Sequence, residues 1–255
     1  MALTDALGIG AGEAAAILAA FLAGGLVKGA LGFGLPLVTI STLPLVVPVD
    51  LALVLNALAL PVLNAWQMRS AGAVGPTFRR ILPLLAALVV TLPAGALMAA
   101  SAPTETLTTL LGIAIMAFAA LNLASPRFTI PPGRERAAAV ALGAGAGVVG
   151  GITTINGPFF LVWLIGIGAE RQTFRAALGI LFLATGVLLT GSFAVAGLVD
   201  GPRVVAALVA LMPACAGMWA GDRIARHLPV GLFRKLVLGL LIVLGANIAI
   251  RGAAL

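Results

Sequence analysis

Long, unbroken apolar stretches are the feature of this 255-residue chain that most restricts its fold. Most of them approach the ~20 residues that an α-helix needs to cross the hydrocarbon core of a bilayer. They lack the alternation of apolar and polar residues that a transmembrane β-barrel requires. Only 9% of the residues are charged, whereas a soluble domain has roughly 25%. The sequence therefore predicts an all-α polytopic membrane protein, with apolar stretches at Glu13–Val47, Leu51–Met68, Ile81–Ala100, Thr106–Ala124, Ala137–Gly168, Phe174–Leu198, Val204–Ala220 and Leu232–Ile250.

Two of these stretches, 13–47 and 137–168, are too long for a single crossing. Each contains glycine, proline and polar residues near its middle: "GGLVKGALGFGLP" begins at Gly24 and "GGITTINGP" begins at Gly150. The arms of the first stretch would each measure about 23 Å at ~1.5 Å per residue, less than the ~30 Å of the core. We therefore expect two broken, re-entrant helix hairpins whose tips stop part-way across the membrane. The expected arms are Glu13–Lys28 and Phe33–Val47 in the first hairpin, and about 137–150 and 157–168 in the second.

The two interrupted stretches begin two halves with the same order of elements. The segment "LPAGALMAA", from Leu92, also resembles "MPACAGMWA", from Met212. A duplicated chain is therefore expected. A shift of 122 positions places Gly25, Val27, Gly29 and Pro36 on Gly147, Val149, Gly151 and Pro158.

We expect residues 1–124 to form the first repeat and 137–255 the second, joined by a cytoplasmic linker at 125–136. Each repeat would contain one hairpin and three crossings, and an odd number of crossings inserts the second repeat upside down relative to the first. Inverted repeats with broken helices occur in many secondary transporters, whose sites lie near the bilayer midplane. The expected elements are hairpin 13–47 and transmembrane helices 51–68, 81–100 and 106–124, then hairpin 137–168 and transmembrane helices 174–198, 204–220 and 232–250.

The distribution of basic residues favours hairpins over single crossings. With hairpins, twelve basic residues gather on one face, Arg203 and Arg251 lie on the other, and Lys28 lies inside the membrane. If each long stretch crossed the membrane once, eight basic residues would lie on one face and six on the other, which favours neither orientation. Full-length antiparallel helix pairs would give the same split as hairpins, and the short arms favour the re-entrant form. By the positive-inside rule the basic loops are cytoplasmic and both termini lie outside. The twelve are Arg69, Arg79, Arg80, Arg127, Arg134, Arg136, Arg171, Arg175, Arg223, Arg226, Arg234 and Lys235.

The interruptions predict an anion site made largely of backbone. Irregular backbone at membrane depth is tolerated only where protein buries it or a wet cavity solvates it. Pro36 and Pro158 fit the first turn of a restarting helix, where the missing N–H costs nothing. Such a restart leaves unpaired N–H groups and about half a positive charge, to which Lys28 adds a full charge. Thr153, Thr154 and Asn156 can cap the second restart or offer side-chain donors.

Several of these residues also have purely structural interpretations. Lys28 could extend to a lipid headgroup or lie in a loop outside the lipid. Gly29 and Gly151 suit close helix packing as well as they suit a site. Cys215 and His227 fit packing and an ordinary surface position. Asparagines within membrane helices more often join helices by hydrogen bonds than contact a ligand, and those concerned are Asn56, Asn64, Asn122 and Asn247.

All eight acidic residues map to loops or helix ends, so a buried proton relay or a carboxylate cage for a cation lacks its usual parts. We expect no metal site, no cofactor and no catalytic residue. A membrane-embedded enzyme is a distant alternative, because it would need a nucleophile with a base, or paired carboxylates, at one depth. The net charge of +7 does not indicate nucleic-acid binding, since the basic residues are spread over several loops.

The segment "GLVKGALGFGLPLVTISTLPL" and its counterpart "GAGVVGGITTINGPFFLVWLIGI" resemble the sulfite exporter TauE/SafE family of membrane permeases, over nearly the whole chain. The resemblance implies a multi-pass transporter of the bacterial inner (plasma) membrane that moves sulfite, organosulfonates or other small anions. The second interruption has "TTIN" where a glycine-rich stretch is expected. The resemblance points to Gly29, Gly32, Gly34, Pro36, Gly151, Asn156 and Pro158.

The combined hypothesis is a secondary transporter or facilitator that exports a small anion, either sulfite or a short organosulfonate. An importer of sulfate, thiosulfate or a small carboxylate is the alternative. The expected partners are the small anion and the lipid bilayer, without nucleic acid, and a homo-oligomer is possible. The candidate substrate-binding residues are Lys28, Gly29, Gly32, Gly34, Pro36, Thr153, Thr154, Asn156, Gly157 and Pro158.

Overall fold

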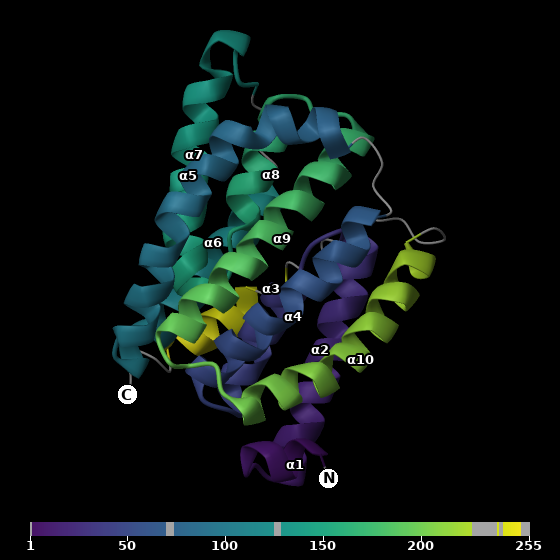
Figure 1. The fold of residues 1–255 in the computed structure, drawn as a ribbon, viewed down its shortest axis with the longest axis vertical. Coiled ribbons are helices and arrows are strands. Elements are labelled where there is room, and N and C mark those ends of the chain that lie inside the picture. Colours follow the sequence, from purple (N-terminus) through teal and green to yellow (C-terminus); the bar gives the residue numbers. More distant parts are fainter. Residues whose placement is uncertain (1, 70–73, 125–128, 226–238, 240–241, 251–255) are drawn as a thin grey trace.

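The computed structural model describes residues 2–69, 74–124, 129–225, 239 and 242–250. Throughout this part of the chain the regular structure is helical, and no strand occurs in it (Figure 1). Residues 242–250 are helical as well. The elements are α1 (Ala2–Leu7), α2 (Ala11–Leu31), α3 (Leu35–Thr42), η1 (Leu43–Leu45), α4 (Val49–Arg69), α5 (Val74–Ser101), α6 (Thr104–Ala124), η2 (Pro132–Arg134), α7 (Glu135–Thr153), α8 (Gly157–Gly166), α9 (Arg171–Val195) and α10 (Gly201–Ile224).

The all-α polytopic class expected from the sequence is confirmed. Six of the described helices are long and apolar enough to cross a membrane, namely α2, α4, α5, α7, α9 and α10. The expected helix 232–250 lies partly outside the described residues. His227, Arg127 and the basic residues 226, 234 and 235 lie wholly outside them. The division into two inverted repeats stays a prediction.

Both long apolar stretches are interrupted where the sequence indicates. The first helix of the first stretch ends at Leu31, and its return helix α3 begins at Leu35. In the second stretch, α7 ends at Thr153 and α8 begins at Gly157. The α8 helix returns to the end of the molecule at which α7 starts, because the Ile130 N–H donates to the Gly166 carbonyl at 2.7 Å.

The expected lengths were wrong for the first arm of each hairpin, which is longer than expected, whereas α8 begins where the expected arm 157–168 begins and ends two residues earlier. The α2 helix has 21 residues and α7 has 19, so they are about 31 Å and 28 Å long at ~1.5 Å per residue. The return helices have only 8 and 10 residues. The α2 helix continues past Lys28 because its first left-handed residue is Gly32, at φ 83°. The α7 helix likewise continues to Thr153 before Thr154 turns left-handed at φ 59°.

Glycines pack the long arm α2 directly against α10. A Cβ on Gly25 or Gly29 would overlap the backbone carbonyl of Ala214 or Met218. Reciprocally, glycines of α10 face backbone carbonyls of α2. Small residues four apart on both helices let the two backbones approach closely, as in membrane helix pairs that lack a hydrophobic driving force. The α10 glycines and the α2 carbonyls that they face are Gly217 with Leu22 and Gly221 with Leu26.

The long arm α7 packs on α5 in the same manner. A Cβ on Gly143 or Gly151 would overlap the backbone of Leu84 or Leu92, and one on Gly95 would overlap the Val148 carbonyl. Each long arm therefore lies against a helix from the other half of the chain. The structure supports the helix-packing interpretation of Gly29 and Gly151, since both glycines face the backbone of a neighbouring helix.

Most helix ends that carry described basic residues lie toward one end of the molecule, and Arg203 at the start of α10 lies toward the other. Figure 1 shows the end of α4 and the starts of α5, α7 and α9 in its upper half, the end of α10 at about mid-height, and the starts of α2, α4 and α10 in its lower half. Two ion pairs support this layout: Arg80 of α5 pairs with Glu135 of α7 at 2.9 Å, and Arg203 of α10 pairs with Asp50 of α4 at 2.7 Å. The side of the membrane on which each end lies stays a prediction.

Substitution of Gly25 by alanine tests the packing of α2 on α10. The new methyl group would overlap the Ala214 carbonyl and push the helices apart, at a cost of about 1–3 kcal/mol for overpacking. We expect a lower thermal unfolding midpoint in detergent, measured by tryptophan fluorescence. The matched control is Gly191→Ala in α9, because a Cβ there meets nothing within 4 Å. An equal effect of the two substitutions would contradict the close contact.

Candidate functional site

A buried lysine occupies the last turn of α2. The Lys28 side chain is 2% exposed. Its ammonium group donates to Asn64 Oδ1 at 2.6 Å and to Gln67 Oε1 at 2.8 Å, both on α4. It also lies 5.5 Å from the centroid of the Phe182 ring on α9. The lysine is therefore held between three helices by two neutral amides and an aromatic face.

The positive charge of Lys28 has no carboxylate partner among the described residues. The ion pairs that those residues form with one another involve Arg80 and Arg203 at helix ends. Burial of a charge without an opposite charge is costly, although hydrogen bonds recover part of that cost. The carbonyl end of α2 also favours a cation in its last turn. A negative guest beside Lys28 would supply the missing counter-charge.

The headgroup and loop interpretations of Lys28 were wrong. The residue lies within a helix, and its ammonium group bonds to α4 inside the protein. Asn64, expected to join helices, does so by accepting from Lys28, while its own Nδ2 donates to the Leu60 carbonyl at 2.8 Å.

Both restarting helices begin without a side-chain cap. The N-cap residues are Gly34 for α3 and Asn156 for α8, and neither side chain bonds to the first turn. Pro36 and Pro158 stand in those first turns, as expected from the sequence. The capping role considered for Asn156 was wrong, because its side-chain oxygen accepts from no N–H of the first turn, while its amide nitrogen donates to Thr185 Oγ1 at 2.6 Å.

Thr154 connects the second interruption to α4 and α3. It is the one described residue other than glycine with a positive φ, and a β-branched side chain in this region costs about 1–3 kcal/mol. Its hydroxyl accepts from Asn56 Nδ2 at 2.9 Å, and Asn56 Oδ1 accepts from Thr39 of α3 at 3.2 Å. Asn56 therefore joins the return helix of the first hairpin to the turn of the second.

Two phenylalanine rings border groups from both interruptions. Phe118 of α6 packs edge-to-face with Phe33, at 6.0 Å between ring centroids. A Cβ on Gly157, the first residue of α8, would lie 3.6 Å from the Phe118 ring and 3.5 Å from the Phe182 ring. Because Phe182 also faces Lys28, the start of α8 and the ammonium group border the same ring.

The candidate residues thus separate into two groups. The structure brings Lys28, Asn156 and Gly157 around Phe182 and Thr185 of α9. Other candidates face elsewhere. A Cβ on Gly34 would press on the side chain of Val27, and Gly29 faces α10. The nearest atom to a Cβ on Gly32 would be Gln67 Nε2, at 3.8 Å.

Sequence analysis named Asn56 and Asn64 as residues that join helices, but it missed Gln67 of α4 and the residues of α9 that hold these groups. Asn56, Asn64 and Gln67 are all buried, and their spacing places them on one face of α4. The three amides on one face of an apolar helix were a signal in the sequence for buried hydrogen bonds, because such amides need partners inside the protein. Phe182 and Thr185 carried no comparable signal. The Asn122 side chain lies outside the described residues, and Asn247 is exposed.

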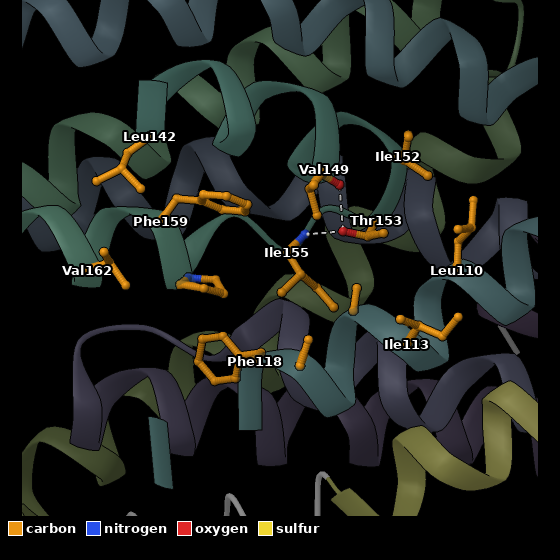
Figure 2. Close-up of a pocket in the computed structure, with 13 residues that line it drawn as sticks. Leu110, Ile113, Phe118, Leu142, Val149, Ile152, Thr153, Ile155, Phe159 and Val162 are labelled. Carbon is orange, nitrogen blue, oxygen red and sulfur yellow. Dashed lines mark hydrogen bonds between the residues drawn. The ribbon is translucent and has the colours of Figure 1, made fainter. Parts of the chain in front are cut away.

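An apolar cavity of about 440 Å³ lies on the other side of the second interruption, between α6, α7 and α8 (Figure 2). Figure 2 shows Phe118, Phe159 and Leu110 around it. The hydroxyl of Thr153, which lines it, donates to the Val149 carbonyl at 2.7 Å and accepts from the Ile155 N–H at 3.1 Å. Thr153 and Pro158 therefore border a cavity without charged lining residues, which does not suit an anion.

Comparison with known families gives one match that covers most of the chain. The model of the family described as sulfite exporter TauE/SafE matches residues 16–248. Comparison with curated proteins and with solved structures gives no significant match. The family match includes both interruptions, Lys28 and the amides of α4. The chain therefore belongs to the sulfite exporter TauE/SafE family of membrane permeases.

Proposed function

We propose that this protein is a secondary transporter or facilitator that exports a small anion, either sulfite or a short organosulfonate. The observation that carries the proposal is Lys28, which is buried without a carboxylate partner among the described residues. Buried charges within membrane segments usually mark a substrate or ion pathway. The anion would lie beside Lys28 and the start of α8.

The start of α8 supports this position for the anion. The first N–H groups of a helix lack intrahelical partners, and the helix dipole adds about half a positive charge there. In α8, Pro158 has no N–H and the Phe159 N–H bonds to the Asn156 carbonyl at 3.2 Å, which leaves the Gly157 N–H as the donor at this start. The side chain of Asn156 does not cap it. An oxyanion could therefore accept from the Gly157 N–H and from Lys28 together.

The membrane potential supports export as the direction. A cytoplasm-negative potential drives each negative charge outward by about 2.3 kcal/mol per 100 mV. A uniporter therefore needs no coupling ion to expel a monovalent anion. The eight acidic residues of the sequence map to loops or helix ends, so a carboxylate relay that would couple export to protons has no evident members.

Removal of the Lys28 charge tests the site. We expect Lys28→Ala to weaken sulfite binding by roughly 10- to 100-fold, because a charge-assisted hydrogen bond contributes about 1.5–3 kcal/mol. Lys28→Arg should keep binding but alter the order of preference among sulfite, sulfate and sulfonates, since a guanidinium group has a different donor geometry. Isothermal titration calorimetry of the purified protein in detergent measures both.

The control for this change is Arg79→Ala, which removes the same charge from an exposed position near the start of α5. It should leave binding within about twofold. Unchanged sulfite binding in Lys28→Ala, with the protein still folded by size-exclusion chromatography, would remove the lysine from the site.

Imposed membrane potential tests the transport mode. In proteoliposomes without a pH gradient, we expect a potential of 100 mV to drive a monovalent anion toward a concentration ratio of about 50-fold, because ~2.3 kcal/mol acts on each charge. A valinomycin potassium gradient sets the potential, and labelled sulfite reports the flux. Transport that requires a proton gradient and ignores the potential would contradict electrogenic uniport.

A further inference from the structure

Two side-chain atoms in the described part of the chain are buried without a hydrogen-bond partner, Asn156 Oδ1 and Trp163 Nε1. Buried polar atoms in proteins are nearly always paired, so each exception needs an explanation. Asn156 is the more informative, because it is fully buried and immediately precedes the start of α8. Its oxygen can only accept a hydrogen bond.

Thr185 holds one end of the Asn156 amide and leaves the other end unpaired. The Thr185 hydroxyl donates its single proton to the Leu181 carbonyl at 2.8 Å. It can therefore only accept from Asn156, whose Nδ2 lies 2.6 Å away. In this arrangement of the Asn156 amide, the atom left without a partner is the oxygen.

The residues near Asn156 include the groups that the proposed anion would bind. Phe182, one helical turn before Thr185 on α9, contacts both the start of α8 and the Lys28 ammonium group. A ligand that carries acceptor oxygens alone can satisfy the ammonium group and the Gly157 N–H. It would leave Asn156 Oδ1 without a partner. A ligand that also carries an O–H or N–H group can satisfy all of them.

We propose that Asn156 selects anions that carry a hydrogen-bond donor of their own. The substrate class is then hydrogen sulfite, or a short sulfonate with a hydroxyl or amino group. The inference rests on the proposed function and adds a specificity determinant to the same site. A site built to bond a hydroxyl group discriminates strongly against an analogue without it, because the buried protein atom is then left unpaired.

Two monoanions of similar size test the inference: 2-hydroxyethanesulfonate carries a terminal hydroxyl group, and 1-propanesulfonate has a methyl group in its place. Isothermal titration calorimetry of the purified full-length protein measures the ratio of their dissociation constants. We expect the wild-type protein to bind the hydroxylated anion at least about tenfold more tightly, as for one buried hydrogen bond.

Asn156→Leu removes the acceptor and keeps a side chain of similar size. It should weaken binding of 2-hydroxyethanesulfonate by roughly tenfold and change binding of 1-propanesulfonate by less than about twofold. The matched control is Asn247→Leu, since Asn247 is exposed and lies in the helix 242–250. That substitution should leave both dissociation constants unchanged. The wild-type ratio alone tests the inference if Asn156→Leu does not fold.

The outcomes separate this inference from the proposed function. A wild-type ratio near one, or a ratio that Asn156→Leu leaves unchanged, overturns the role of Asn156, as does failure of both sulfonates to bind. The proposed function survives those results if sulfite binds and Lys28→Ala weakens its binding. Absence of sulfite binding as well, or binding that is indifferent to Lys28, overturns both.

Discussion

The burial of one ammonium group without an opposite charge is the constraint on which the proposed site depends. Lys28 can occupy this position because Asn64 and Gln67 accept from it and because it stands in the last turn of α2. The close contact of α2 with α10 holds that turn in place, since Gly25 and Gly29 leave no space between the two backbones. Helix packing and charge are therefore linked, because a shift of α2 would move the ammonium group away from the amides of α4.

The arrangement of the hairpins shows what surrounds the irregular backbone of the two interruptions. Each long arm is long and apolar enough to cross a membrane and lies against a helix from the other half, while each return helix is short. The turns are consequently surrounded by protein, which supplies partners that lipid cannot. Asn56 is one such partner, because it bonds to Thr39 of the first hairpin and to Thr154 of the second.

The sequence predicts the helical class, the positions of both interruptions and the prolines of the restarting helices. The length of the apolar stretches and the glycines and prolines within them are local signals that need no knowledge of distant contacts. The sequence does not predict that α2 extends to Leu31, because the packing of α10 on the α2 glycines is a contact between distant parts of the chain. The same holds for the site. Lys28 and Asn156 are recognisable as polar residues beside an interruption, whereas Phe182 and Thr185 acquire their roles only through the contact between α9 and the start of α8.

The two interruptions differ in chemistry, although a shift of 122 positions superposes them in sequence. The first uses Gly32 in the left-handed region, where glycine adopts a positive φ without steric cost. The second uses Thr154 there, and the bond from Asn56 offsets part of the resulting strain. Asn156 takes the place of Gly34 and is held by Thr185. One interruption thus contributes a cation and the other contributes fixed amide and hydroxyl groups, which is the asymmetry that the proposed anion with its own donor would require.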